Sequence, residues 1–155
     1  MKIRTLEQLS DSLAEDLAWR KKELSDLRSL IESSSTMSES KKRVLLRSGI
    51  TILYAHWEGF IKSASSNYLE YVAMQRLRYD ELSSNFVALA LKAKLDAAND
   101  TSKATIFTEA IDFIRSKLGQ RGLVPYKDVV QTGANLSSSI LREIACVLGL
   151  DYSPF

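Results

Sequence analysis

The chain has 155 residues, about the size of one domain. Hydrophobic residues make up 45% of it and charged residues 26%, which is typical of a globular domain and excludes a disordered chain. The net charge of +2 is too small to indicate nucleic-acid binding by itself, and a single cysteine and a single histidine argue against a disulfide or a structural zinc site.

The first residues, "MKIRTLEQLSDSLAEDL", lack the apolar core of a signal peptide. No apolar run reaches the roughly 18 residues that a membrane span needs. We therefore expect a cytoplasmic protein with no membrane partner.

The first element predicted is a long amphipathic helix over Thr5 to Glu32, with Thr5 as its N-terminal cap. Arg20 is the one break in its apolar stripe, and we expect the Asp16/Arg20 pair to lie on the exposed side and to add little stability. The stripe follows a spacing of three and four residues through Leu6, Leu9, Leu13, Leu17, Leu24, Leu27 and Ile31.

A serine-rich linker, Ser33 to Ser40, separates this helix from a second long one over about Glu39 to Arg76. The two are expected to fold back on each other as an antiparallel hairpin. Further helices are predicted over Asp80 to Asn99 and Lys103 to Leu118.

The stretch from Gly119 to Asn135 holds three glycines and a proline and reads as a loop. Asn135 is the predicted cap of a last helix, Leu136 to Leu148, which Gly149 closes. Cys146 has apolar neighbours and is expected to be a small buried residue. No strand pattern is present, so the fold class is all-α, a bundle of about five helices.

The helix centred on "ILYAHWEGF" is apolar almost all round. At 100° per residue, Leu53, Trp57, Phe60 and Ala64 form its predicted core stripe. A polar stripe runs along another side through Arg47, Thr51, Tyr54, Glu58 and Lys62.

His56 lies nine residues after Arg47 and so points about 180° away from it. We expect His56 to pack at a helix interface. Arg47 and Glu58 stay open between two interpretations, a solvated or interfacial face with a Glu58–Lys62 pair, or groups that support a site. Arg47, Glu58 and His56 are thus the weak catalytic candidates. No nucleophile elbow, phosphate-binding loop, dinucleotide fingerprint or metal-binding helix motif is present, and we expect no cofactor and no metal.

Four blocks in order, "KIRTLEQLSDSLAEDLAWRKKELSDLRSLI", "ILYAHWEGF", "LSSNFVALALKAKL" and "NLSSSILREIACVLGLDYSPF", resemble the MAE_28990/MAE_18760-like group of HEPN domains. The resemblance covers essentially the whole chain. It implies an all-helical, dimeric domain from a class rich in metal-independent RNA endonucleases of toxin–antitoxin and phage-defence systems. The partners it implies are a second copy, an RNA substrate and a cognate antitoxin or other protein.

The sequence departs from the family at the R-x4–6-H signature, which the resemblance puts on a late helix, after "LDYSPF". The nearest arginine before His56 is Arg47, nine positions away, so no pair has the required spacing. We expect residues 1–155 to be a single HEPN-like domain that lacks its C-terminal catalytic helix and is inactive alone. The alternatives are a noncatalytic HEPN-like module for dimerization or partner binding, and a structural bundle unrelated to RNA.

Overall fold

The computed structural model describes residues 2–33, 37–99, 104–133 and 135–153. It is all-α, as the sequence predicts, and its described residues contain no strand beyond one isolated bridge between Arg78 and Arg121. The helices are α1 (Leu6–Glu32), α2 (Glu39–Gln75), α3 (Ser84–Asn99), α4 (Ala104–Ser116) and α5 (Ser138–Leu148), with a short 3-10 turn, η1, at Tyr79–Glu81. None of the described helices is long and apolar enough to cross a membrane.

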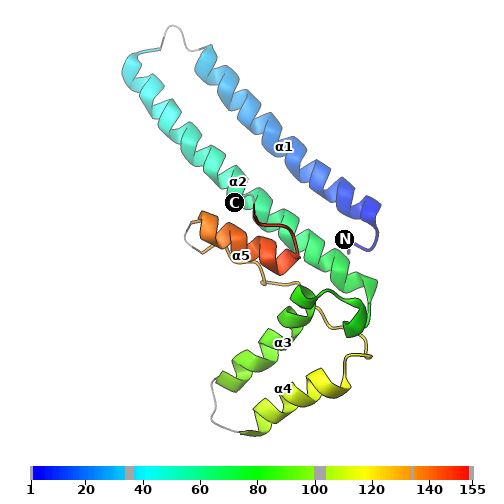
Figure 1. Ribbon diagram of the computed structural model, residues 1–155. Helices are drawn as coiled ribbons and strands as arrows, with labels where there is room; N and C mark the ends of the chain where they lie inside the picture. The colour runs from blue at the N-terminus through cyan, green and yellow to red at the C-terminus, as the bar shows by residue number, and fades with distance from the viewer. Residues whose placement is uncertain (1, 34–36, 100–103, 134, 154–155) are drawn as a thin grey trace.

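The predicted hairpin of the two long helices is confirmed, since α1 and α2 run antiparallel side by side (Figure 1). Thr5 caps α1 as expected: its side chain accepts a hydrogen bond from the Gln8 N–H at 3.1 Å. The Gln8 side chain in turn accepts from the Thr5 N–H at 3.3 Å, which completes a capping box. Residues 34–36 of the expected linker lie outside the described part of the chain.

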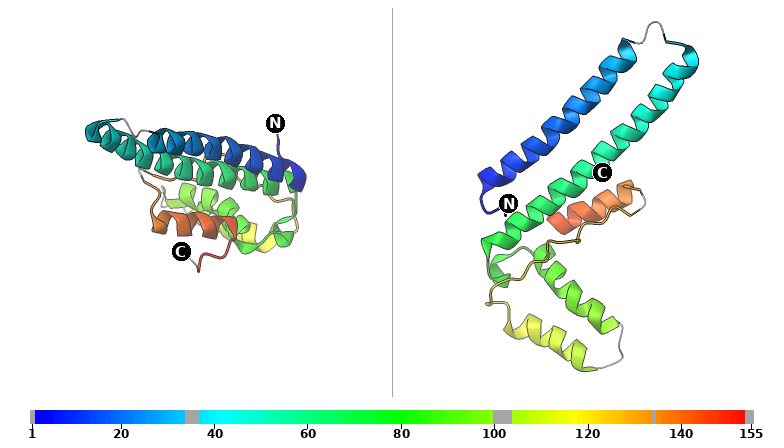
Figure 2. Two further views of the ribbon diagram at one scale, coloured as in Figure 1. Left: turned by 90° about the horizontal axis from the view of Figure 1, so that it is seen from above. Right: turned by 180° about the vertical axis from the view of Figure 1, so that it is seen from behind.

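The remaining helices form a second layer on the side of α2 away from α1, in which α5 packs on α2, α3 on α5 and α4 on α3 (Figure 2). The main core lies where this layer meets the C-terminal half of α2. Leu69 is completely buried there. The side chains that surround it are Val72, Phe86, Val124, Val130, Leu136, Ile144 and Leu148.

The α3–α4 pair has its own small core, built by Tyr79, Ala90 and Phe113. The Tyr79 and Phe113 rings meet edge to face with centroids 4.8 Å apart. The helix predicted from Asp80 begins later than expected, because Asp80 lies in the η1 turn. The predicted start of the next helix, Lys103, lies outside the described residues.

The predicted loop before α5 is confirmed over its described residues, which leave out residue 134, but the predicted cap is wrong by two residues. Ser137, not Asn135, caps α5, since its side chain accepts from the Ile140 N–H at 3.3 Å. Gly149 closes the helix in the left-handed conformation, with φ of 70°, as expected. The prediction for Cys146 is also wrong, because this residue is exposed. It lies on the outer side of α5, whereas Ile144 and Ala145 face inward.

Candidate functional site

His56 lies in the contact between α2 and α1. Only 8% of the residue is exposed. Its Nε2 is 3.1 Å from Oε2 of Glu23, and its ring meets the Trp19 ring edge to face with centroids 5.2 Å apart. Both ring contacts are to α1, so the imidazole of the chain's single histidine is held by packing between two helices.

Arg20 is the residue that joins the two helices beside His56. The prediction that the Asp16/Arg20 pair is exposed is wrong: the two side chains are only 12% and 16% exposed. Arg20 donates from Nε to Asp16 at 3.1 Å and from Nη1 to the backbone carbonyl of His56 at 3.1 Å. The glycine at 59 makes room for it, since a Cβ there would lie 2.6 Å from Nη1. The break that Arg20 makes in the leucine stripe is the one sequence signal of this role.

Arg47 and Glu58 share a side of α2 that points away from the contact of His56 with α1. Arg47 is exposed on the half of the helix near the hairpin tip, and Glu58 is half-buried nearer the middle. Eleven residues separate them, about 16 Å along the helix. Among the described residues neither makes an ion pair, and the expected Glu58–Lys62 pair does not form. A single chain therefore does not bring Arg47, His56 and Glu58 together.

The predicted core stripe of α2 is wrong in its first half. Leu53 is 54% exposed and Trp57 is 39% exposed. They share one side of the helix with Leu46 and Ile50, which are 46% and 69% exposed. We call these four residues, Leu46, Ile50, Leu53 and Trp57, the α2 stripe. The core of the protein instead lies against the Tyr54 side of the helix. There the Tyr54 hydroxyl accepts a hydrogen bond from the Leu136 N–H.

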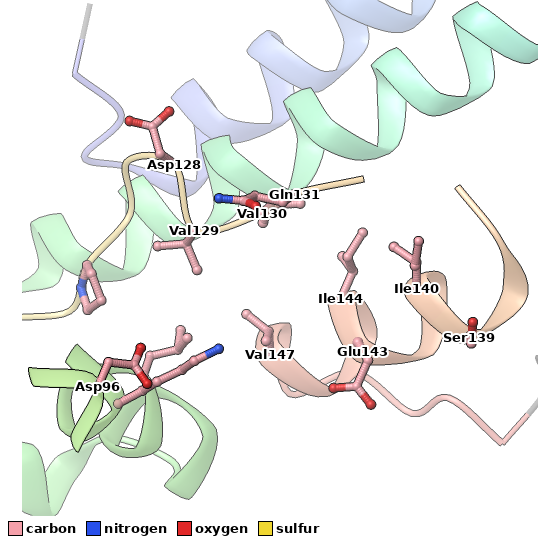
Figure 3. Close-up of a pocket in the computed structure, with 13 residues that line it drawn as sticks. Asp96, Asp128, Val129, Val130, Gln131, Ser139, Ile140, Glu143, Ile144 and Val147 are labelled. Atoms are coloured by element: carbon pink, nitrogen blue, oxygen red, sulfur yellow. The ribbon is translucent and has the colours of Figure 1, made fainter. Parts of the chain in front are cut away.

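A cleft of about 680 Å³ lies between α3, α5 and the loop of residues 125–131 (Figure 3). Its polar lining includes three carboxylates, on Asp96, Asp128 and Glu143, against the single ammonium of Lys92. This excess of negative charge opposes the phosphate backbone of RNA. Arg47, His56 and Glu58 do not line the cleft.

Metal-free RNA cleavage needs a base for the 2′-hydroxyl, an acid for the leaving oxygen and a cation at the phosphate. Arg47, His56 and Glu58 do not assemble such a set within one chain. The histidine is held against α1, and the nearest preceding arginine, Arg47, points to the opposite side of α2. No group of three or more His, Cys, Asp or Glu in the described part of the chain is placed to hold a metal.

His56→Ala is expected to lower the free energy of unfolding by about 1–3 kcal/mol, because it removes a buried ring that packs on Trp19 and Glu23. Thermal melts and an RNA gel shift of the variant check this, with the exposed Arg47→Ala as control. Melting that is unchanged together with lost RNA binding would contradict the packing role.

The chain was also compared with known proteins. The family model for MAE_28990-like HEPN matches residues 9–154, which is nearly the whole sequence. Neither a curated protein nor a solved structure gives a match. The helical hairpin with its second helical layer agrees with the helical fold of HEPN domains. The chain belongs to the MAE_28990-like HEPN family.

Proposed function

We propose that this chain is a cytoplasmic HEPN domain of a bacterial toxin–antitoxin or phage-defence system. In this proposal residues 1–155 form a single domain. The domain has no ribonuclease activity of its own. The observation that carries the proposal is the burial of the chain's single histidine, His56, in the contact between α1 and α2. His56 is buried against Glu23 and Trp19 of α1, and the neighbouring Arg20 is engaged by Asp16 and by the backbone carbonyl of His56. It is therefore poorly placed to exchange a proton with an RNA substrate.

The sequence supports the same conclusion independently of the structure. The resemblance puts four to six residues between the catalytic arginine and histidine of HEPN ribonucleases, whereas eight residues lie between Arg47 and His56. The resemblance implies a parent class that is rich in RNA endonucleases. The proposal is that these 155 residues provide the helical body of such a protein without the Arg–His helix.

A second candidate function is a noncatalytic module that pairs with a second copy or with a cognate protein such as an antitoxin. The α2 stripe favours it, because soluble monomers rarely expose contiguous apolar surface of this kind. The two candidates are compatible, since a body without an active site can still act through contacts of its helices.

An RNA cleavage assay tests the proposal. The purified chain is incubated with total tRNA and mRNA in EDTA, and the products are resolved on a denaturing gel. We expect no products above a protein-free blank. Cleavage that persists in EDTA, co-purifies with the chain and is lost in His56→Ala would contradict it. Cleavage that is equal in His56→Ala would still contradict the proposal, and would place the catalytic groups elsewhere than at His56.

A further inference from the structure

The cleft between α3, α5 and residues 125–131 has an apolar floor that belongs to the main core. Val130 and Ile144 are buried members of that core, and Ile140 and Val147 pack against it from α5. Its volume of about 680 Å³ lies in the ~300–1,000 Å³ range of ligand pockets in proteins. The floor therefore offers a place for an apolar side chain of a ligand.

The charged groups of the cleft have no partners within the chain. Its lining holds three carboxylates and one ammonium, and none of the four takes part in an ion pair in the described part of the chain. The cations next to the lining in sequence, Lys127 and Arg142, do not belong to it. This excess of negative charge is complementary to a cationic ligand.

Asp96 and Glu143 are the two carboxylates that are placed to meet such a ligand. Asp96 lies on α3 and Glu143 on α5, with Val147 between them in the view of Figure 3. The carboxylate of Asp128 points away from the cleft (Figure 3). No group of three or more His, Cys, Asp or Glu among the described residues is placed to hold a metal. The two carboxylates therefore fit a ligand with two separate cationic groups better than a metal ion.

The loop contributes an extended backbone along one border of the cleft (Figure 3). Burial alternates along this segment as in a strand: Val130 and Thr132 are buried, whereas Val129 and Gln131 are more exposed. The backbone N–H and C=O groups of residues 129–131 form no hydrogen bond with the described part of the chain. An extended backbone with unpaired groups is the kind of edge to which a peptide can add a strand.

A peptide is the one class of ligand that uses all three features. A small organic cation would meet the carboxylates and the apolar floor, but it would leave the backbone of residues 129–131 unpaired. A nucleic acid would bring its phosphates to a negatively charged lining. A basic peptide supplies cationic side chains, an apolar side chain and a backbone that can pair with the loop.

We infer that the cleft binds an extended basic segment of a partner protein, which adds a strand to residues 129–131. Alternate side chains of a strand point to the same face, so the segment has the pattern basic–x–apolar–x–basic. The apolar side chain packs on the floor, one basic side chain meets Asp96 and the other meets Glu143. This goes beyond the lack of ribonuclease activity. It rests on the second candidate function, partner binding, and names a surface and a partner chemistry for it.

Calorimetric titration of the full 155-residue chain with the capped pentapeptide Lys-Thr-Leu-Thr-Lys tests the inference. We expect a dissociation constant below about 1 mM. The peptide Thr-Lys-Leu-Lys-Thr has the same composition, but in a strand its lysines point away from the face of its leucine. It should bind about tenfold more weakly, because one strand face no longer carries both kinds of group.

Two N-methylated forms of the first peptide test the backbone pairing. Successive N–H groups of a strand point to opposite edges, so one form is methylated at both threonines and the other at the leucine and the second lysine. Only one of these sets can face residues 129–131. One form should therefore bind about tenfold more weakly, and the other should bind nearly as well as the parent peptide.

The double variant Asp96→Asn/Glu143→Gln tests the charge contacts. Both residues are exposed, so the fold should persist, and circular dichroism checks this. Affinity for Lys-Thr-Leu-Thr-Lys should fall by about tenfold or more. Asp128→Asn is the matched control, because it removes a carboxylate of the same lining that points away from the cleft. Asparagine also tolerates the φ of 55° at this position, and we expect a change of less than about twofold.

Several results would overturn the inference: no binding of Lys-Thr-Leu-Thr-Lys, equal binding of the two peptide sequences, equal affinities of the two methylated forms, or a loss in Asp128→Asn as large as in the double variant. Spermidine is titrated in parallel. Binding of spermidine as tight as that of the peptide, and lost in the double variant, would make the cleft a site for a small organic cation instead. These variants leave the α2 stripe unchanged, so a failure counts against the cleft and not against partner binding as such. The RNA cleavage assay tests the lack of ribonuclease activity separately.

Discussion

Leu69→Ala is expected to lower the free energy of unfolding by about 2–5 kcal/mol. Leu69 is 0% exposed and lies where α2 meets the second helical layer. Removing three carbon atoms there leaves a cavity that Phe86, Val130 and Leu148 cannot fill without moving out of their own packing. The expected loss of stability therefore has two parts, the lost transfer free energy of the removed atoms and the cost of the cavity left behind.

Urea denaturation followed by circular dichroism measures this loss. Leu30→Ala is the matched control, because Leu30 lies on α1 and is 51% exposed. We expect the control to change the free energy of unfolding by about 0.5 kcal/mol or less. Equal losses in the two variants would mean that the core is not centred on Leu69.

Arg20→Ala is expected to lower the free energy of unfolding by about 1.5–3 kcal/mol. The Arg20 side chain donates hydrogen bonds both to Asp16 of α1 and to the backbone carbonyl of His56 on α2. Its guanidinium also lies 4.6 Å from the centre of the Trp19 ring. Truncation leaves a largely buried carboxylate without its cation and opens a gap next to Gly59.

Arg28→Ala is the matched control for this prediction, since it removes the same residue type from an i,i+4 pair on the same helix. Arg28 donates to Glu32 at 2.7 Å, and this hydrogen bond, followed by the charge of Glu32, raises the pKa of the Arg28 guanidinium. The pair is exposed to solvent, which screens it, so we expect no measurable change in stability. A loss as large as that of Arg20→Ala would show that the burial of the pair is not what matters.

The helices and the hairpin could be predicted from the sequence because they depend on local signals. The leucine spacing of α1, the Thr5 cap and the closing Gly149 each act within one or two turns of helix. The cap of α5 was misplaced by two residues because "NLSSS" offers several polar residues that can accept the capping hydrogen bond.

The faces of α2 could not be assigned in the same way. A helix that is apolar almost all round gives little indication of which side its neighbours cover. The sequence predicts that Leu53 and Trp57 are core residues. In the structure, α1 covers the side of α2 that carries Gly49, and the second helical layer covers the side that carries Tyr54. The α2 stripe therefore stays exposed.

The role of Arg20 depends on a contact between residues 36 positions apart. Helical periodicity carries no information about such a contact. A charged residue in an apolar stripe interrupts the pattern, and the pattern does not show that the residue bonds to a second helix. The opposite directions of His56 and Arg47, in contrast, could be predicted from the sequence, because a separation of nine residues on one helix fixes the angle between them.

The most direct test of the account measures RNA cleavage by the purified chain over a wide range of chain concentrations. The same purified sample is analysed by sedimentation and incubated with tRNA and mRNA in EDTA. We expect the RNA to stay intact at every concentration, whatever the state of association. A chain that cuts RNA, and loses that activity in Arg47→Ala, His56→Ala or Glu58→Ala, would contradict the account. It would mean that these residues form an active site between two subunits.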